Sequence, residues 1–215
     1  MATKRGILII LEGNDRVGKT TQAQKIVQWF RSQQKPVEMV CFPDRDTPIG
    51  KLIDGYCRKE IQMHDRVIHL LFTANRWERY EDMQKKLNAG VNLVVDRYSF
   101  SGVAYSSAKE EMPFDWCRAP ESGLLKPDCI LFLASDIKNL EKRNDFGEEV
   151  YENANFQTKV CQAYTKMRDE SWNVSHRFIF CQNFFFNFLC FRLLMLAIEQ
   201  LNKFTKTSLM QLNQN

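Results

Sequence analysis

The hydrophobic residues of this chain fall into two alternating patterns. Short continuous apolar runs, rich in β-branched residues, are typical of buried parallel strands and cover residues 7–11, 37–42, 91–95 and 129–133. Stretches with apolar residues at helical spacing predict helices at residues 21–34, 48–59, 64–88 and 153–169. Gly90 follows the third stretch, at a position typical of a helix stop. Because strands and helices alternate, we predict a doubly wound α/β fold with a mostly parallel sheet.

The segment from residue 178 to residue 191 follows neither pattern. It reads FIFCQNFFFNFLCF and contains seven of the 16 Phe residues. One interpretation is an unusual aromatic strand at the edge of the core. Phe codons are rich in T, however, as is the tract before a splice acceptor, and Val174-Ser175 is compatible with a GT splice donor. We therefore hypothesise that residues 174–192 are translated intron within one domain of residues 1–215.

Composition narrows the class of protein. An apolar fraction of 44% and a charged fraction of 26% over 215 residues are ordinary for one globular domain. A net charge of +4 without a basic run gives no sign of a nucleic-acid groove, and no apolar run is long enough to cross a membrane. The seven Cys lack zinc-type or CxxC spacing, and Cys41 and Cys129 are expected in the core. We predict a cytoplasmic protein that binds neither nucleic acid nor membrane; a nuclear or mitochondrial location stays open.

A phosphate-binding loop is the strongest chemical signal. Residues 13–20 match the pattern GxxxxGK[ST], directly after a predicted strand and before a predicted helix. Glycine lets backbone N–H groups converge on phosphate oxygens, Lys19 is expected at the β- and γ-phosphates of ATP, and the Thr20 hydroxyl is expected on Mg²⁺. The predicted ATP-binding residues of this segment are Gly13, Asn14, Asp15, Arg16, Val17, Gly18, Lys19, Thr20 and Thr21.

Two further charged residues have more than one interpretation. Asp96 ends the third apolar run and is either a second magnesium ligand beside Thr20 or a helix cap. Arg16 either neutralises charge on the transferring phosphoryl group or is an ordinary surface Arg of a loop.

A phosphate loop does not say which molecule receives the phosphoryl group. Arg45 and Arg97 each follow a predicted strand, so both are expected at the carboxyl edge of the sheet, where they could grip a phosphate monoester. Phe72 and Arg76 are four residues apart on one helix face. They suit stacking on a pyrimidine and hydrogen bonding to its carbonyl group, although a core Phe beside a surface Arg would give the same pattern.

Several motifs in one order resemble the thymidylate kinases of eukaryotes and poxviruses, which are nucleoside-monophosphate kinases of the P-loop class. The motifs lie between residues 5 and 170 and read LEGNDRVGKTTQ, FPDRDTPIGKLID, HLLFTANRWE, VVDRYSFSGVAY, GLLKPDCILFL and FGEEVYEN. The resemblance implies a three-layer α/β/α domain with a mostly parallel five-stranded sheet and a short mobile lid near residues 143–153. It also implies a homodimer that transfers a phosphoryl group from ATP with Mg²⁺ to thymidine monophosphate (dTMP).

The resemblance also implies roles for individual residues. Phe72 would stack on thymine, Arg76 would bind its carbonyl oxygen, and Arg45 and Arg97 would hold the acceptor phosphate. Asp15 would contact the sugar 3′-hydroxyl, Tyr105 would exclude a 2′-hydroxyl with Gly102 giving room, Tyr151 would close over the acceptor, and Arg143 would face the ATP base. The implied acceptor-binding set is Asp15, Phe42, Arg45, Phe72, Arg76, Arg97, Gly102, Tyr105 and Tyr151, and the catalytic set is Asp15, Arg16, Lys19, Asp96 and Arg97.

Two departures from the family pattern keep other interpretations open. Vertebrate members carry an Arg where this lid has Val150, from which we expect weaker lid closure but intact chemistry. After Trp172 the family continues into another strand, whereas this chain enters the Phe-rich run. The alternatives are a kinase of the same fold with another acceptor, such as AMP or a deoxynucleoside, and a nucleotide-binding protein without catalytic activity.

Overall fold

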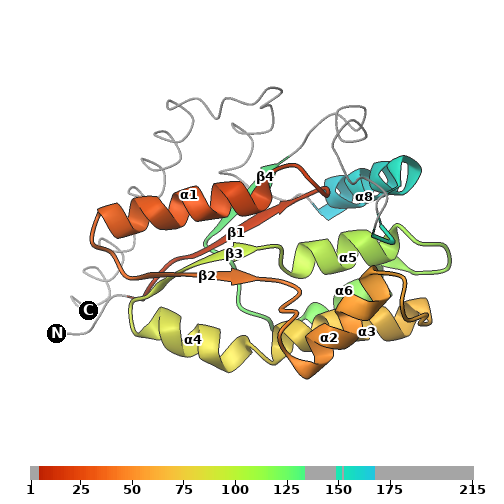
Figure 1. Ribbon diagram of the computed structural model, residues 1–215, viewed down its shortest axis with the longest axis horizontal. Coiled ribbons are helices and arrows are strands. Elements are labelled where there is room, and N and C mark those ends of the chain that lie inside the picture. The colour runs from red at the N-terminus through yellow and green to blue at the C-terminus, as the bar shows by residue number, and fades with distance from the viewer. Residues whose placement is uncertain (1–4, 134–148, 152, 168–215) are drawn as a thin grey trace, which may run out of the picture.

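Within the described residues, a four-stranded parallel sheet forms the centre of the fold (Figure 1). The computed structural model describes residues 5–133, 149–151 and 153–167. The strand order is β2-β3-β1-β4, with the bounds β1 Leu8–Gly13, β2 Val37–Cys41, β3 Asn92–Asp96 and β4 Cys129–Leu133. The predicted α/β fold is therefore confirmed. The fifth strand, expected after Trp172, and the segment 174–192 lie outside the described residues.

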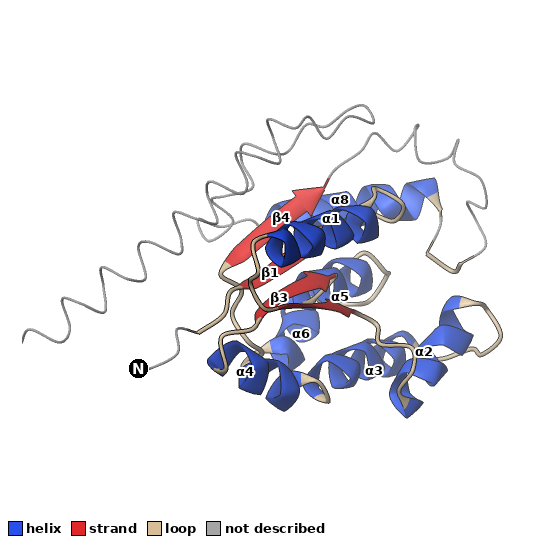
Figure 2. Ribbon diagram, turned by 60° about the vertical axis from the view of Figure 1, so that its left-hand side comes forward, coloured by secondary structure: helices blue, strands red, loops and turns tan. Residues whose placement is uncertain are grey.

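Helices cover both faces of the sheet (Figure 2). Alternate residues of β1 point to opposite faces. Ile9 and Leu11 pack with α1 (Lys19–Ser32), while Leu8 and Ile10 belong to the cluster that includes α4 (Tyr80–Asn88), α5 (Ser99–Ser107) and α8 (Ala154–Met167). All four of these β1 side chains are fully buried, which explains why the first apolar run does not alternate with polar residues.

A second group of helices lies beyond α5 and forms a wall at the carboxyl edge of the sheet (Figure 1). It contains α2 (Pro48–Cys57), α3 (Asp65–Trp77), α6 (Phe114–Arg118) and the short 3₁₀ helix η1 (Ala119–Glu121). Ile53 of α2 and Ile68 of α3 share a small apolar cluster. The loops that follow β2 and β3 enter α2 and α5, so that their polar residues face this wall.

The prediction of a single helix over residues 64–88 is wrong, because α3 and α4 are separate helices. Glu78 lies at the junction, and its Oε1 accepts hydrogen bonds from the Thr47 hydroxyl at 2.7 Å and from Asn75 Nδ2 at 2.6 Å. The contact with Thr47 ties this junction to the loop after β2, a tertiary contact that helical periodicity alone does not reveal. Gly90 is confirmed as a helix stop. It follows Ala89, the C-cap of α4, and its φ of 86° is left-handed.

The two Cys residues that were expected in the core differ. Cys129 of β4 is 1% exposed and packs in the α1 cluster, as expected. Cys41 is exposed, because it is the last residue of β2, at the carboxyl edge of the outer strand. Among the described residues, no helix combines the length and the apolar character that crossing a membrane requires.

Candidate active site

The loop between β1 and α1 has the backbone geometry of a phosphate cradle. Gly13 has a φ of 139°, and a Cβ there would lie 2.1 Å from the carbonyl oxygen of Leu133 on β4. Gly18 has a φ of 92°, which L side chains rarely adopt. Both glycines are therefore required by the path of the chain. The hollow beside this loop has a volume of about 870 Å³ and is lined by Arg16, Gly18, Lys19, Thr20, Thr21, Cys41, Phe42, Pro43, Arg45, Asp96 and Arg97.

Lys19 is buried at the first turn of α1, and its ammonium group donates to the Asn14 carbonyl oxygen at 2.5 Å. Burial, reinforced by the positive charge of Arg97, lowers the pKa of Lys19 to about 7. A bound polyphosphate would restore the charged form, because an opposite charge favours ionisation. Lys19 is thus a buried cation at the start of α1 that lines the hollow beside the loop.

Thr20 and Asp96 lie side by side at the carboxyl edge. The Thr20 hydroxyl donates to Asp96 Oδ2 at 2.5 Å, and Asp96 ends β3 directly opposite Leu11 of β1. A hydroxyl and a carboxylate are hard oxygen donors, which Mg²⁺ prefers, and Mg²⁺ completes its shell with water and substrate phosphates. The pair fits a nucleotide-bound magnesium ion.

A second hollow, of about 610 Å³, adjoins the first. Its lining is Asp15, Phe42, Pro43, Arg45, Cys57, Phe72, Arg76, Arg97, Tyr98, Ser101, Gly102, Tyr105, Ser106, Glu149 and Tyr151. Phe42, Pro43, Arg45 and Arg97 line both hollows, so the two meet at these residues. All nine residues of the predicted acceptor set lie in this second lining.

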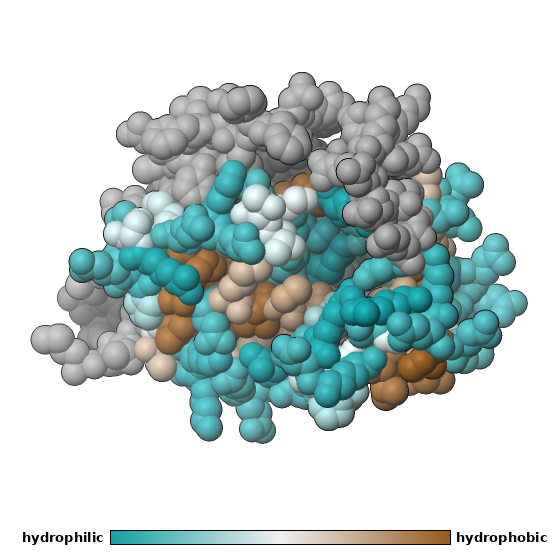
Figure 3. All heavy atoms as spheres, viewed as in Figure 1, coloured by the Kyte–Doolittle hydropathy of each residue, from teal (hydrophilic) through white to brown (hydrophobic). Residues whose placement is uncertain are grey.

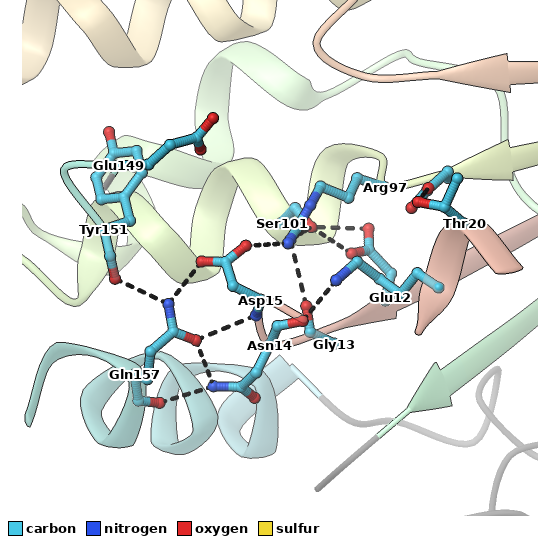
Figure 4. Close-up of polar contacts among 12 residues, drawn as sticks. Glu12, Gly13, Asn14, Asp15, Thr20, Arg97, Ser101, Glu149, Tyr151 and Gln157 are labelled. Carbon is cyan, nitrogen blue, oxygen red and sulfur yellow. Dashed lines mark hydrogen bonds and ion pairs between the residues drawn. The ribbon is translucent and has the colours of Figure 1, made fainter. Parts of the chain in front are cut away.

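Arg97 joins the phosphate loop to the second hollow (Figure 4). Its guanidinium donates to the Gly13 carbonyl oxygen at 3.2 Å and to Ser101 Oγ at 3.3 Å, and forms an ion pair with Asp15. It also lies 5.2 Å from the centre of the Tyr105 ring. Burial would raise the pKa of Asp15, but the positive charges of Arg97 and Lys19 hold this pKa below its ordinary value. Asp15 is therefore ionised and available as an acceptor.

Arg45 occupies the other side of the junction between the hollows. One guanidinium nitrogen lies 2.5 Å from Asp54 of α2 and the other 2.8 Å from Glu149 of the lid. The N–H of Val150 donates to the Cys57 carbonyl oxygen at 3.0 Å, which fixes the end of the lid against α2. Arg45 therefore connects the lid to the site where the two hollows meet.

The far end of the second hollow is built around Arg76. The interpretation of Arg76 as a surface residue is wrong, since it is 3% exposed and paired with Glu121 of η1. A Cβ at Gly102 would lie 2.3 Å from Arg76 Nη2, so the absence of a side chain there makes room for this guanidinium. Phe72 lies one helical turn before Arg76 and lines the same hollow.

Aromatic rings close the second hollow. Tyr151 stacks on Phe156 of α8 with ring centres 5.5 Å apart, and Tyr105 meets Tyr151 edge-on at 5.5 Å. Phe72 lies 6.5 Å from Tyr151. The residue at the end of the lid is thus packed against both α3 and α5.

The chain is similar in sequence and fold to known proteins. The family model described as thymidylate kinase matches residues 11–178 of the chain. The chain belongs to the thymidylate kinase family. It is 47% identical over 174 residues to the human thymidylate kinase, covering 80% of this chain and 82% of the relative, and 48% identical over 174 residues to that of Danio rerio, with the same coverage. The solved structure of the Candida albicans thymidylate kinase is 41% identical, covers 77% of this chain and 79% of its own, and superposes with a TM-score of 0.70.

Not every predicted residue of this thymidylate kinase site reaches a hollow. Val17 lies in the phosphate loop but is absent from the lining of either hollow, and the buried Asn14 donates instead to the side chain and carbonyl of Gln157. Arg143 lies outside the described residues, as does most of the lid. The role of Arg143 at the ATP base therefore stays a prediction.

Residues outside the predicted set support the site from behind. Gln157 of α8 is fully buried and donates to Asp15 Oδ2 at 2.7 Å and to the Tyr151 carbonyl oxygen at 2.9 Å (Figure 4). A Gln on an amphipathic helix carries no signal for such a role. Glu12 did carry a signal in the sequence, because burying a carboxylate at the end of an apolar strand costs free energy unless it has hydrogen-bond partners.

Proposed function

We propose that this chain transfers the γ-phosphoryl group of ATP to dTMP, giving dTDP and ADP, with Mg²⁺ as the cofactor. The observation that carries the proposal is the meeting of a phosphate-loop hollow with a second, aromatic hollow at Arg45 and Arg97. Two phosphorylated ligands placed in these hollows would bring their phosphates together at that junction. Phosphoryl transfer depends mainly on such positioning and on charge neutralisation.

The residues of the donor hollow suit the triphosphate of ATP. The backbone N–H groups of the loop and the N-terminus of α1 would bind the phosphates, and Lys19 would supply a positive charge. Mg²⁺ held by Thr20 and Asp96 would neutralise charge on the β- and γ-phosphates. Arg16 lines this hollow, where it is placed to stabilise the transferring group. Asn14, Val17 and Thr21 would shape and extend this cradle.

The acceptor hollow suits a pyrimidine deoxynucleotide. Arg45 and Arg97 would hold its 5′-phosphate, and Asp15 would accept a hydrogen bond from the 3′-hydroxyl. Phe72 offers a stacking surface for the base, and Arg76 a donor for its carbonyl oxygen. Tyr105, packed between Arg97 and Tyr151, would exclude a 2′-hydroxyl.

The bond changes need no covalent intermediate. An oxygen of the dTMP phosphate forms a bond to the γ-phosphorus of ATP while the bond from that phosphorus to the bridging oxygen breaks, and ADP leaves. Arg16, Lys19 and Arg97 offset the negative charge that gathers around the phosphorus, and Asp15 keeps Arg97 in place. Closure of Tyr151 and the rest of the lid would exclude water and so suppress ATP hydrolysis.

The functional protein is proposed to be a homodimer. Apolar side chains are exposed on neighbouring helices: Leu52 of α2 is 45% exposed, and Val67 and Leu70 of α3 are 50% and 47% exposed. Figure 3 shows patches of hydrophobic residues among mainly hydrophilic ones on the face that carries these helices. A second copy of the chain would remove such a surface from water.

An assay with a choice of acceptors tests the proposed reaction. Formation of ADP from ATP and Mg²⁺ is followed with dTMP, dUMP, AMP and thymidine as acceptors, one at a time. We expect the highest kcat/KM with dTMP. A strong preference for AMP would contradict the acceptor assignment, and no turnover with any acceptor would favour a nucleotide-binding protein without catalytic activity.

A further inference from the structure

Glu12 is a fully buried carboxylate to which the proposed mechanism gives no role. It lies near the end of β1 and is 0% exposed. Four hydrogen bonds surround it. Its Oε1 accepts from the backbone N–H groups of Tyr98 at 2.9 Å and Ser101 at 3.2 Å, and its Oε2 accepts from Ser101 Oγ at 2.5 Å and Tyr164 at 3.0 Å.

Two of these hydrogen bonds fix the start of α5. Tyr98 is the N-cap residue of α5, and no side chain of its own segment caps the helix. In a capping box, two side chains of the helix itself satisfy the N–H groups of the N-cap and of the third helical residue. Here both of these N–H groups donate instead to Glu12, which belongs to β1. The carboxylate therefore ties the N-terminus of α5 to β1.

The other contacts lead to Arg97. An ionised Glu12 can only accept hydrogen bonds, so the Ser101 hydroxyl donates to this form and keeps its lone pairs for Arg97 Nη1 at 3.3 Å (Figure 4). The Arg97 backbone N–H donates to the Leu11 carbonyl oxygen at 2.9 Å, and Arg97 Nη1 also donates to the Gly13 carbonyl oxygen. Leu11, Glu12 and Gly13 thus hold Arg97 at three points.

The backbone of Arg97 needs this support. Its φ is 65°, in the left-handed region that a residue with a branched or bulky side chain rarely adopts. Without fixed partners on both sides, the segment from Asp96 to Tyr98 would relax, and the guanidinium would move away from the junction of the two hollows. Burial raises the pKa of Glu12, while its donors and Arg97 oppose that rise.

We propose that Glu12 is a positioning residue that acts through Ser101 and the N-terminus of α5 to orient Arg97 toward the acceptor phosphate. The inference rests on the proposed role of Arg97. It assigns to Glu12 an effect on the acceptor substrate and none on ATP.

The central test compares KM values for the two substrates in Glu12→Gln. The amide keeps the size of the side chain but presents an NH₂ group to Ser101 in place of an acceptor. We expect KM for dTMP to rise about tenfold to a hundredfold, the range for losing a charged hydrogen bond, while KM for ATP stays within about twofold. A role in folding alone would lower the active fraction and leave both KM values unchanged.

Two further variants separate the path through Ser101 from general damage. Ser101→Ala removes the linking hydroxyl and is expected to raise KM for dTMP in the same direction. Tyr164→Phe removes the other donor to Oε2 and the 2.8 Å hydrogen bond of Tyr164 with Ser101 Oγ, but it keeps the Ser101 hydroxyl between Glu12 and Arg97, so KM for dTMP should rise less than in Ser101→Ala. Glu81→Gln, an exposed carboxylate on α4, serves as the matched control.

Arg97→Ala distinguishes failure of this inference from failure of the proposed acceptor site. If Arg97→Ala keeps the full kcat/KM for dTMP, the role of Arg97 is wrong, and that of Glu12 with it. If Arg97→Ala loses activity while Glu12→Gln and Ser101→Ala keep their KM for dTMP, only the inference about Glu12 is overturned. If circular dichroism shows that Glu12→Gln is unfolded, KM for dTMP of Ser101→Ala becomes the test. A raised KM supports the inference about Glu12, and an unchanged KM overturns it.

Discussion

Arg76 and Glu121 form an ion pair that is shielded from water on both sides, with side chains 3% and 5% exposed. Arg76 Nε donates to Glu121 Oε2 at 2.8 Å, Nη2 pairs with Oε1, and the Thr73 hydroxyl adds a further hydrogen bond to Oε1 at 2.7 Å. This bidentate geometry fixes the plane of the guanidinium. Glu121 therefore sets the orientation of the one side chain proposed to read the pyrimidine.

Removing the charge of Glu121 should reduce selectivity for the base. Arg can only donate hydrogen bonds, so a fixed Arg76 favours the carbonyl group of thymine over the amino group of cytosine. In Glu121→Gln we expect kcat/KM for dTMP to fall about tenfold or more and the ratio of dTMP to dCMP turnover to fall with it. Kinetics with both acceptors check this, with the exposed Glu110→Gln as control. An unchanged dTMP to dCMP ratio would show that Arg76 does not read the base.

A single added methyl group at Gly102 should disturb the same pair. The Cβ of Gly102→Ala would meet Arg76 Nη2 at 2.3 Å and Glu121 Oε1 at 3.0 Å. Since both partners are buried, neither can move without breaking a hydrogen bond. We expect a loss of about 1–3 kcal/mol in stability, measured by urea unfolding, and a higher KM for dTMP with KM for ATP unchanged. Equal effects on both substrates would argue against a role at the acceptor base.

The depressed pKa of Lys19 predicts how stability depends on pH. Unfolded Lys19 has a pKa near 10.5 and folded Lys19 one of about 7, so between these values the unfolded chain binds the extra proton. The free energy of unfolding therefore rises as the pH rises from about 7 to 10.5, by at most about 1.4 kcal/mol per pH unit. Below pH 7 the folded protein carries the full destabilisation that comes from burying a charged Lys19. Lys19→Met has no titrating group at this position, so its stability lacks this dependence on pH.

Urea unfolding of both proteins at several pH values, with EDTA and without nucleotide, measures the effect. We expect Lys19→Met to be the more stable protein at pH 7 and its advantage to shrink toward pH 9. Curves that stay parallel would mean that Lys19 titrates normally in the folded protein. In the kinase assay the same variant should lose about a hundredfold or more in kcat, because the buried charge of Lys19 at the phosphates is lost.

An acidic residue on the exposed face of α3 should separate the proposed dimer. Leu70→Glu places a charge among the apolar side chains Leu52 and Val67, and burying it against a second copy would cost several kcal/mol. We expect light scattering to give the mass of a dimer for the unchanged chain and of a monomer for Leu70→Glu. Gln84→Glu on the exposed face of α4 adds the same single negative charge and serves as the control. A monomeric unchanged chain would contradict the homodimer.

The sequence predicted the strands and the residues at their ends well, because both depend on local patterns. Gly13 and Gly18 belong to a loop whose geometry requires glycine, and Lys19 and Thr20 follow directly at the start of α1. Arg45 and Arg97 could be placed together because the carboxyl ends of parallel strands share one edge.

The supporting residues could not be predicted in this way. The sequence SFSGVAYSS of α5 has no amphipathic pattern, because six of its nine residues are buried, and the helix was missed. Glu121 and Gln157 contact residues 45 and 142 positions away in the chain. Contacts of this kind arise from tertiary packing and leave no local signal. The same holds for the junction between α3 and α4, which contacts the loop after β2.

The Phe-rich segment gives the last prediction. The family match ends at residue 178, where the run begins, and seven Phe residues within 178–191 would need burial to avoid an aggregation-prone surface. If residues 174–192 are translated intron, sequencing the transcript should recover a spliced message without them. A chain lacking these residues should then form dTDP faster and aggregate less than the full chain, because the family-like ending would join directly to the domain. A spliced message that still encodes FFFNFLCF, together with equal activity of both chains, would make the segment a genuine part of this kinase.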